Sequence, residues 1–312
     1  MTFWKQWFIS KPFNEGYLPE LDGHEIYFRE FGNPEGQVIL TFHGGPGFWS
    51  RPETVKSFNL KKYRVIQFDQ RGCGKSKPAG KLDNNTTHDN VDDVIRLLDY
   101  LKISEKIILY GGSWGSTMAL AFAECYPDVV KCMVLSKIFL ANDASRKWEL
   151  KGSEVFYPDI LEEIRGGLAD NDLIPDYYIK LINSEDISDQ AKAASLYGSL
   201  ESFLGNMDPK INMHIPDAQE LAMLKVYIYY SAQRFMLKDD ELIINAFKIK
   251  HIPTLIVHNR LDFICPPINA YRLHKVLPES KLIIVADKGH SSKKLKKVID
   301  KEMKIFLDKY GN

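Results

Sequence analysis

The sequence predicts an α/β protein with a mostly parallel central sheet, flanked by helices, and an inserted helical domain. Short runs rich in Val, Ile, Tyr and Phe alternate with amphipathic stretches over residues 25–140, as strands and helices do in such a sheet. Residues 107–109 are apolar throughout, which a strand covered on both faces requires. Residues 148–249 carry helical patterning only, and strand–helix alternation returns after residue 250.

Each element follows from its periodicity and from the residues that end it. The apolar residues of 89–101 share one helical face, and Pro127 ends a second helix at 115–126. The other predicted helices are 190–203, 218–230, 268–276 and 293–307. The predicted strands are 26–31, 38–42, 64–68, 106–110, 130–135, 254–258 and 282–285. We therefore expect residues 1–140 and 250–312 to form one α/β domain, with residues 141–249 inserted into it as a helical cap.

Composition excludes several classes of function. The 312 residues include 41 acidic and 41 basic side chains, so the formal net charge is zero. A nucleic-acid-binding protein normally carries a basic surplus, and we expect no nucleic-acid partner. The one dense basic run is predicted to be a solvated helix face, and it consists of Lys293, Lys294, Lys296 and Lys297. No apolar run approaches the roughly 20 residues that cross a bilayer, so we expect no membrane partner.

The cysteines and the N-terminus predict a cytoplasmic protein. The sequence has four cysteines, none in a C-x-x-C pair or at the spacing of a zinc site, so we expect no metal. Residues 1–10 are aromatic but lack the apolar core and small-residue cleavage site of a secretory signal. They are predicted to form a strap on the domain, with a membrane-surface helix as the alternative.

A candidate nucleophile lies between a predicted strand and a predicted helix. Residues 111–115 read Gly-Gly-Ser-Trp-Gly, which is a G-x-S-x-G elbow in the structural context that gives this motif its meaning. Such a turn exposes the Ser113 hydroxyl above the sheet and directs the amides of the following helix toward it. The alternative is a small-residue helix start that only needs close packing.

A serine hydroxyl needs a base and a group that orients the base. Asp262 and His290 each follow a predicted strand, in the order Ser, Asp, His that α/β-hydrolases use. The carboxyl ends of the strands are where open α/β sheets place their sites. Asp287 is a competing acid, but it shares the loop of His290, whereas Asp262 comes from the neighbouring strand. The remaining histidines, with one exception, are expected to have structural, surface or turn roles.

The exception is His43, which opens a second glycine-rich loop. Residues 43–47 read His-Gly-Gly-Pro-Gly and follow the strand at 38–42, as an oxyanion loop of the HGG type does. We expect the backbone N–H groups of Gly45 and Trp114 to donate to the oxyanion, with His43 supporting the loop; a plain turn is the alternative. Residues 74–76 resemble the end of a P-loop, but Asp69 occupies the required glycine position and Pro78 follows, so nucleotide binding is rejected.

The sequence resembles the proline iminopeptidases, also called prolyl aminopeptidases, of the α/β-hydrolase superfamily. The resemblance covers nearly the whole chain and is strongest in the α/β domain. The stretches that carry it are Asp22-Gly-His-Glu-Ile-Tyr, Gly32-Asn-Pro, His43-Gly-Gly-Pro-Gly, Phe68-Asp-Gln-Arg-Gly-Cys-Gly-Lys-Ser76, Asn85-Thr-Thr, Gly111-Gly-Ser-Trp-Gly-Ser116, Ile138-Phe139, Phe156-Tyr-Pro-Asp159, Asn269-Ala and Gly289-His-Ser291.

The resemblance implies a Ser113–His290–Asp262 triad in a cytoplasmic enzyme that removes N-terminal proline from small peptides without a metal or other cofactor. It also implies that Glu201 holds the substrate amine and that Phe139 lines the proline pocket. The chain departs from the family in three places. Ser136 stands where the family usually has Arg, Glu149 where it usually has Tyr, and residues 221–238 lack the second expected carboxylate.

Three hypotheses of function follow. The leading one is a serine exopeptidase that prefers N-terminal proline, with Glu201 binding the amine and Glu149 as a candidate for the missing second charge. The second is an esterase or amidase that uses the same triad beneath a different cap pocket. The third is a hydrolase-like binding protein without turnover. Glu201 as a solvated charge on an amphipathic helix is the alternative to its binding role. The sequence predicts no oligomeric state.

Overall fold

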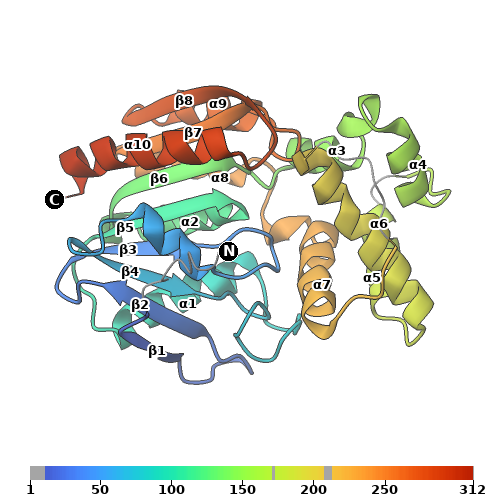
Figure 1. The fold of residues 1–312 in the computed structure, drawn as a ribbon, viewed down its shortest axis with the longest axis horizontal. Helices are drawn as coiled ribbons and strands as arrows, with labels where there is room; N and C mark the ends of the chain where they lie inside the picture. Colours follow the sequence, from blue (N-terminus) through green and yellow to red (C-terminus); the bar gives the residue numbers. More distant parts are fainter. Residues whose placement is uncertain (1–10, 171–172, 207–212, 312) are drawn as a thin grey trace, which may run out of the picture.

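The computed structural model describes residues 11–170, 173–206 and 213–311 (Figure 1). The N-terminal segment 1–10, predicted as a strap, lies outside the described residues. An eight-stranded sheet crosses the larger of the two lobes in Figure 1, with helices on both of its faces. A smaller, wholly helical lobe lies beyond one edge of this layered lobe.

The sheet has the strand order β1-β2-β4-β3-β5-β6-β7-β8. β1 pairs antiparallel with β2, which pairs antiparallel with β4, and the other pairs are parallel. The carboxyl ends of the six parallel strands therefore meet at one edge. The strand bounds are Asn14–Tyr17 (β1), Tyr27–Gly32 (β2), Gln37–Phe42 (β3), Tyr63–Phe68 (β4), Ile107–Ser113 (β5), Val130–Ile138 (β6), Thr254–Leu261 (β7) and Ser280–Lys288 (β8).

The central strands are buried on both faces, as their continuous apolar runs predict. In β5, Ile107 and Leu109 belong to the apolar cluster on one face, whereas Ile108 belongs to the cluster on the other. The first face is covered by α1 (Thr87–Tyr100), α2 (Trp114–Cys125) and α9 (Ile268–Val276). The second face is covered by α10 (Lys293–Tyr310) and the 3₁₀ turn η1 (Pro52–Ser57).

α1 and α10 begin at residues whose side chains satisfy their first N–H groups. Thr86 and Asp89 form a reciprocal capping box at the start of α1, and the Ser292 side chain accepts from the Leu295 N–H at the start of α10. On α10 the apolar positions face the sheet. The four lysines of the basic run are exposed, as the sequence predicted.

In its described residues, the inserted region contains helices and connecting loops but no strand. Its elements are α3 (Asp143–Leu150), η3 (Gly152–Val155), α4 (Pro158–Arg165), α5 (Ile174–Ile182), α6 (Ile187–Asn206) and α7 (Ala218–Ala232). These helices enclose an apolar core of their own, separate from the two sheet clusters. In α7, Leu224 and Ile228 belong to this cap core, whereas Val226 and Tyr230 belong to the core of the sheet domain. One helix therefore serves both lobes.

The chain after α7 returns to the sheet domain before residue 250. It forms η5 (Arg234–Met236), α8 (Glu241–Ile244) and η6 (Asn245–Ile249). Leu242, Ala246 and Ile249 are buried in the same cluster as α2 and α9. We therefore propose that the cap, predicted as residues 141–249, ends before α8.

Candidate active site

Ser113 is the last residue of β5 and immediately precedes α2. Its backbone has φ 58° and ψ −134°, a conformation that costs a non-glycine residue on the order of 1–3 kcal/mol. The turn also packs closely. A Cβ atom on Gly111 would lie 2.2 Å from the carbonyl oxygen of Gly115, and one on Gly115 would lie 2.3 Å from that of Phe42. The glycines thus permit a tight strand-to-helix turn that leaves the Ser113 side chain half-exposed at the sheet edge.

The structure brings Asp262 and His290 together. Asp262 directly follows β7, and His290 lies two residues beyond β8. The Nδ1 atom of His290 lies 3.0 Å from Oδ1 and 2.9 Å from Oδ2 of Asp262. Asp287, the competing acid, accepts instead from the Ser292 hydroxyl at 2.6 Å. The neighbouring strand therefore supplies the histidine's partner.

Asp262 is held as a carboxylate although it is buried. Burial opposes ionisation, but the adjacent His290 and the Cys265 N–H hold the pKa of Asp262 below its usual range. Its Oδ1 atom accepts from the backbone N–H groups of Ile264 at 3.1 Å and Cys265 at 3.0 Å. These fixed donors orient the carboxylate toward the imidazole.

A second histidine, His258, lies next to the Asp262 carboxylate. His258, inside β7, has its Nε2 atom 3.6 Å from Oδ2 of Asp262. Its Nδ1 atom accepts from the Ile138 N–H at 3.0 Å, so Nε2 carries the proton and donates to the Cys265 carbonyl at 2.7 Å. Burial lowers the pKa of His258, which keeps the ring neutral. The sequence predicted only a structural histidine at this strand.

The predicted oxyanion donors both belong to segments that adjoin Ser113. Trp114 is the first residue of α2, so its N–H has no acceptor within the helix. Gly45, with φ 118°, lies in the loop after β3 and lines the same cavities as Ser113. The His43 ring accepts through Nε2 from the Gln70 N–H at 3.0 Å and donates through Nδ1 to the Gly44 carbonyl at 2.9 Å. The ring is neutral, since burial lowers its pKa.

Gln70 connects the two donor elements, a role that sequence reasoning missed. Its side chain donates to the His43 carbonyl at 3.3 Å and accepts from the Trp114 indole N–H at 2.8 Å. The loop after β3 and the turn after β5 are thereby held at a set distance. The Asp-Gln-Arg run supported the family resemblance, but nothing in its pattern indicated this contact.

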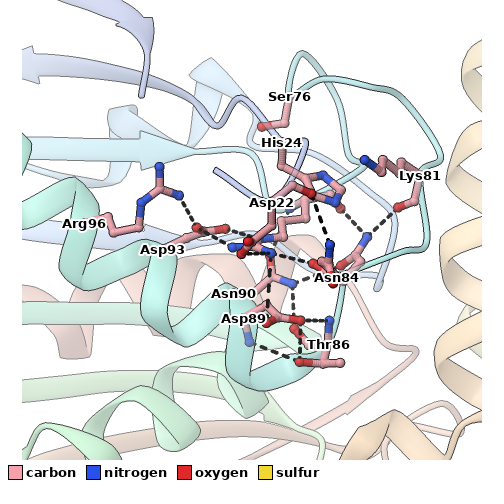
Figure 2. A network of polar contacts seen from close by, with 12 residues as sticks. Asp22, His24, Ser76, Lys81, Asn84, Thr86, Asp89, Asn90, Asp93 and Arg96 are labelled. Carbon is pink, nitrogen blue, oxygen red and sulfur yellow. Dashed lines mark hydrogen bonds and ion pairs between the residues drawn. The ribbon is translucent and has the colours of Figure 1, made fainter. Parts of the chain in front are cut away.

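A buried polar network anchors the loop that carries Gln70. The Arg71 guanidinium donates to both Asp93 oxygens, at 2.7 and 3.0 Å, and Asp93 also accepts from Arg96 at 2.6 Å (Figure 2). Asn90 accepts from the Arg71 N–H at 2.9 Å and donates to the Tyr230 hydroxyl at 3.0 Å. This network joins the loop to α1 and to the cap helix α7. His24, for which the sequence predicted a structural role in a surface or turn context, is buried beside it.

Two cavities meet at Ser113, and they differ in size and lining. The larger one, about 340 Å³, is also lined by His290, Ser136 and Lys137. The smaller one, about 20 Å³, lies between the sheet domain and the cap and has Phe139 and Glu149 in its wall. Gly45 lines both. The predicted oxyanion position therefore lies between them.

The small pocket has an apolar wall with one carboxylate. Phe139 packs edge-on against Phe235 with ring centroids 5.0 Å apart. Glu149 is 8% exposed and accepts from the Tyr227 hydroxyl at 2.6 Å. Burial raises the pKa of Glu149, while the Tyr227 hydroxyl and Arg146 oppose this rise. Glu201 lies in α6, but its side chain is outside what the structure describes.

Comparison with known proteins places this geometry in a family. The family described as the alpha/beta hydrolase fold matches residues 37–296. The proline iminopeptidase of Arabidopsis thaliana is 38% identical over 291 residues, which cover 90% of this chain and 76% of that protein. The proline iminopeptidase of Neisseria gonorrhoeae is 36% identical over 287 residues, covering 90% and 92%. The chain belongs to the proline iminopeptidase family.

Solved structures support the fold of this family member. A proline iminopeptidase-related protein from Thermus thermophilus superposes with a TM-score of 0.57 at 18% identity, covering 95% of this chain and 98% of the other. An epoxide hydrolase from Vigna radiata gives a TM-score of 0.62 at 17% identity, with the same coverage. At these identities the comparison concerns the fold alone, and it is the α/β-hydrolase fold that the sequence predicted.

Two further findings describe this member of the proline iminopeptidase family. Across residues 11–170, 173–206 and 213–311, no helix is both long enough and apolar enough to cross a membrane. Within the same residues, no group of three or more His, Cys, Asp or Glu side chains is arranged so that it could hold a metal ion.

Proposed function

We propose that the protein is a serine exopeptidase that releases an N-terminal residue, preferably proline, from small peptides. The observation that carries this proposal is the His290 ring, which contacts the Asp262 carboxylate and lines the same cavity as Ser113. Family membership at 36–38% identity supports the substrate class, because the relatives are named proline iminopeptidases.

The mechanism assigns one role to each group. Ser113 Oγ attacks the first peptide carbonyl, and His290 Nε2 takes the hydroxyl proton and later gives it to the leaving nitrogen. Asp262 holds the imidazole in the Nδ1–H tautomer and stabilises the imidazolium that forms. The backbone N–H groups of Gly45 and Trp114 bind the oxyanion, each contributing about 3 kcal/mol in comparable sites. Water then hydrolyses the acyl-enzyme by the same proton relay.

Glu149 is the carboxylate that we assign to the substrate amine. Among the described residues that line the small pocket, it is the one with a carboxyl group. A substrate ammonium entering this pocket lowers the pKa of Glu149 again and creates an enclosed ion pair, which is screened less than a surface pair. Glu201 remains the second candidate for this amine. Phe139 faces the same space and suits a prolyl ring.

The size of the small pocket constrains how the first residue binds. Its volume of about 20 Å³ has room for about one water molecule. A prolyl ring therefore requires the side chains of the cap and of the Phe139 wall to move apart. A narrow pocket of this kind favours small, compact first residues.

The location that we propose for the protein is the cytoplasm.

An esterase or amidase is the second candidate, and the environment of Glu149 is the observation that favours it. Because burial raises the pKa of Glu149, a protonated Glu149 can donate to an uncharged acyl group instead of pairing with an ammonium. Such an enzyme would use the same triad on N-blocked amides or simple esters.

Hydrolysis of free and N-acetylated prolyl arylamides tests the two candidates. We expect wild type to prefer the free amine by about tenfold or more, since one enclosed charge pair contributes about 1.5–3 kcal/mol. Glu149→Gln reduces that preference, Glu201→Gln tests the second carboxylate, and Glu162→Gln on the exposed side of α4 is the matched control. Equal hydrolysis of both substrates by wild type contradicts the exopeptidase and supports the esterase or amidase.

A further inference from the structure

The larger cavity beside Ser113 is lined by cations and by no acid. Lys137 and Arg51 line it, and no Asp or Glu is among its described lining residues. Lys137 is half-buried and Arg51 is exposed at the rim. This is the reverse of the small pocket, where a carboxylate is the charged group.

The backbone aims Lys137 into this cavity. β6 pairs with β5 so that Gly112 is opposite Ser136 and Ser113 is opposite Ile138, which leaves Lys137 as the extra residue of a β-bulge. Its φ is 52°, in the left-handed region that a lysine rarely adopts. Bulges beside active sites redirect a side chain, and a strained non-glycine residue persists where its surroundings hold it.

The redirected side chain extends over the residue that precedes the nucleophile. A Cβ atom placed on Gly112 would lie 3.1 Å from Lys137 Cε and 2.7 Å from Ser136 Oγ. The stem of Lys137 therefore lies beside Gly112, and Lys137 lines the same cavity as Ser113. The charge also acts on this region, since Lys137 is among the groups that lower the pKa of His258.

The position of His290 determines which part of the substrate enters this cavity. In acyl transfer the histidine gives its proton to the leaving nitrogen, so the leaving group must lie beside the ring. His290 lines the larger cavity and is not part of the small pocket's wall. The acyl residue thus occupies the small pocket, and the leaving group occupies the cavity that contains Lys137.

We propose that Lys137, assisted by Arg51 at the rim, binds a carboxylate of the leaving group. This inference rests on the proposed exopeptidase function and specifies its substrates. In a dipeptide the carboxylate is the free C-terminus of the second residue, and in a longer peptide it is an acidic side chain at that position. Lys137 is then a specificity-determining residue, and the site recognises both ends of a short zwitterionic peptide.

Three substrates distinguish the two sources of the carboxylate. Prolyl-glycine carries a terminal carboxylate, prolyl-glycinamide carries none, and prolyl-glutamic acid α-amide carries one only on its side chain. For wild type we expect kcat/KM for prolyl-glycine to exceed that for the glycinamide by about tenfold or more, the ratio that one charge-assisted contact of about 1.5 kcal/mol provides. An advantage of the glutamic acid α-amide over the glycinamide would assign the cation to side-chain carboxylates as well.

Variants of Lys137 test the residue itself. Lys137→Met should bring the acid-to-amide ratio close to one, and Lys137→Arg should retain most of it. Lys137→Gly removes the charge and also suits the positive φ, so it tests the same loss in a variant with less backbone strain. Lys131→Met, at the opposite end of β6, is the matched control and should keep the wild-type ratio.

The outcomes separate this inference from the function on which it rests. Hydrolysis of all three substrates by wild type at equal kcat/KM overturns the Lys137 assignment and leaves the exopeptidase intact. An acid-to-amide ratio that survives in both Lys137→Met and Lys137→Gly also overturns it. If no prolyl substrate is hydrolysed while a fluorophosphonate probe still labels Ser113, the exopeptidase proposal fails, and this inference fails with it.

Discussion

The two cavities that meet at Ser113 are built from different parts of the molecule and carry opposite charge. The small pocket is closed by cap residues and has a buried carboxylate, Glu149, in an apolar wall. The larger cavity is formed at the ends of the parallel strands and has Lys137 and Arg51 as its charged side chains. A peptide with a free amine at one end and a carboxylate at the other fits this arrangement in one direction only. Under the proposed function, the charges on both sides of Ser113 set the orientation of the bound peptide.

The largest expected effect comes from removing the group that the two cavities share. Ser113→Ala should lower kcat for prolyl arylamides by about a thousandfold or more, because the substitution removes the hydroxyl that attacks the substrate carbonyl. Since both cavities keep their lining, substrate should still bind. Turnover is measured beside circular dichroism and thermal unfolding. Full activity of a folded variant would contradict the assignment.

The second-largest effect is expected from a change at Asp262, the residue that orients the His290 ring for proton transfer. Asp262→Asn should lower kcat/KM by about a thousandfold, because the amide stabilises the wrong His290 tautomer and no longer stabilises the imidazolium. Asp287→Asn, whose partner is Ser292, should change it by less than about threefold. The comparison of the two variants under identical conditions decides the assignment, and the reverse order would contradict it.

A smaller effect is expected from a change at Gln70, which joins the His43 loop to Trp114 between the two cavities. Gln70→Ala removes the contacts that join the His43 loop to Trp114. We expect kcat to fall by about tenfold, which is less than the hundredfold or more for loss of a donor itself, with little change in KM. Gln190→Ala in α6, far from this contact, is the control. An equal fall in both variants would show that Gln70 has no specific role.

The smallest effect is expected in the pH dependence of the protein's stability, to which the buried Glu149 of the small pocket contributes. The folded-state pKa of Glu149 is raised by burial, whereas its unfolded value is about 4.3. Above that value the folded protein holds a proton that the unfolded chain releases, so stability falls as pH rises toward the folded pKa.

Glu149→Gln should therefore gain stability relative to wild type as the pH increases. We expect similar melting temperatures at pH 4 and a higher one for the variant at pH 8, measured by calorimetry at both values. The exposed Glu162→Gln variant should show no such trend. A difference that is constant with pH would mean that folding does not raise the pKa of Glu149.

Much of the fold and the core of the candidate site could be predicted from the sequence. Each predicted strand or helix begins and ends within three residues of an observed one. This agreement arises because buried strands and amphipathic helices leave recognisable patterns of apolar residues. Asp262 and His290 were identifiable because each follows a strand, and parallel strands end at the same edge of a sheet. β1 was missed, since its residues Asn-Glu-Gly-Tyr carry no apolar alternation.

What could not be predicted depends on contacts between distant segments. Nothing local indicates that Gln70 bonds to both His43 and Trp114, or that His258 stands behind Asp262. The bulge at Lys137 arises from the pairing register between two strands, which sequence periodicity does not contain. The earlier cap boundary that we propose has a similar origin: the segment after α7 is helical like the cap, but it packs under the sheet.

The position of α7 in both cores bears on how this architecture can be recombined. A segment exchanged between relatives must take its buried contacts with it or leave them behind. An exchange of α3 to α6 must keep the hydrogen bonds from Trp148 to the Phe263 carbonyl and from the His290 N–H to the Gly205 carbonyl, but these helices bury most of their apolar residues within the cap. α7 does not, because Tyr230 packs on Trp114 with ring centroids 5.3 Å apart and hydrogen-bonds to Asn85 and Asn90. A chimera that keeps α7 with the hydrolase domain should fold, and one that splits it away should not. Exchange of α3 to α6 therefore changes one wall of the small pocket, and with it the substrate preference, while the catalytic residues stay the same.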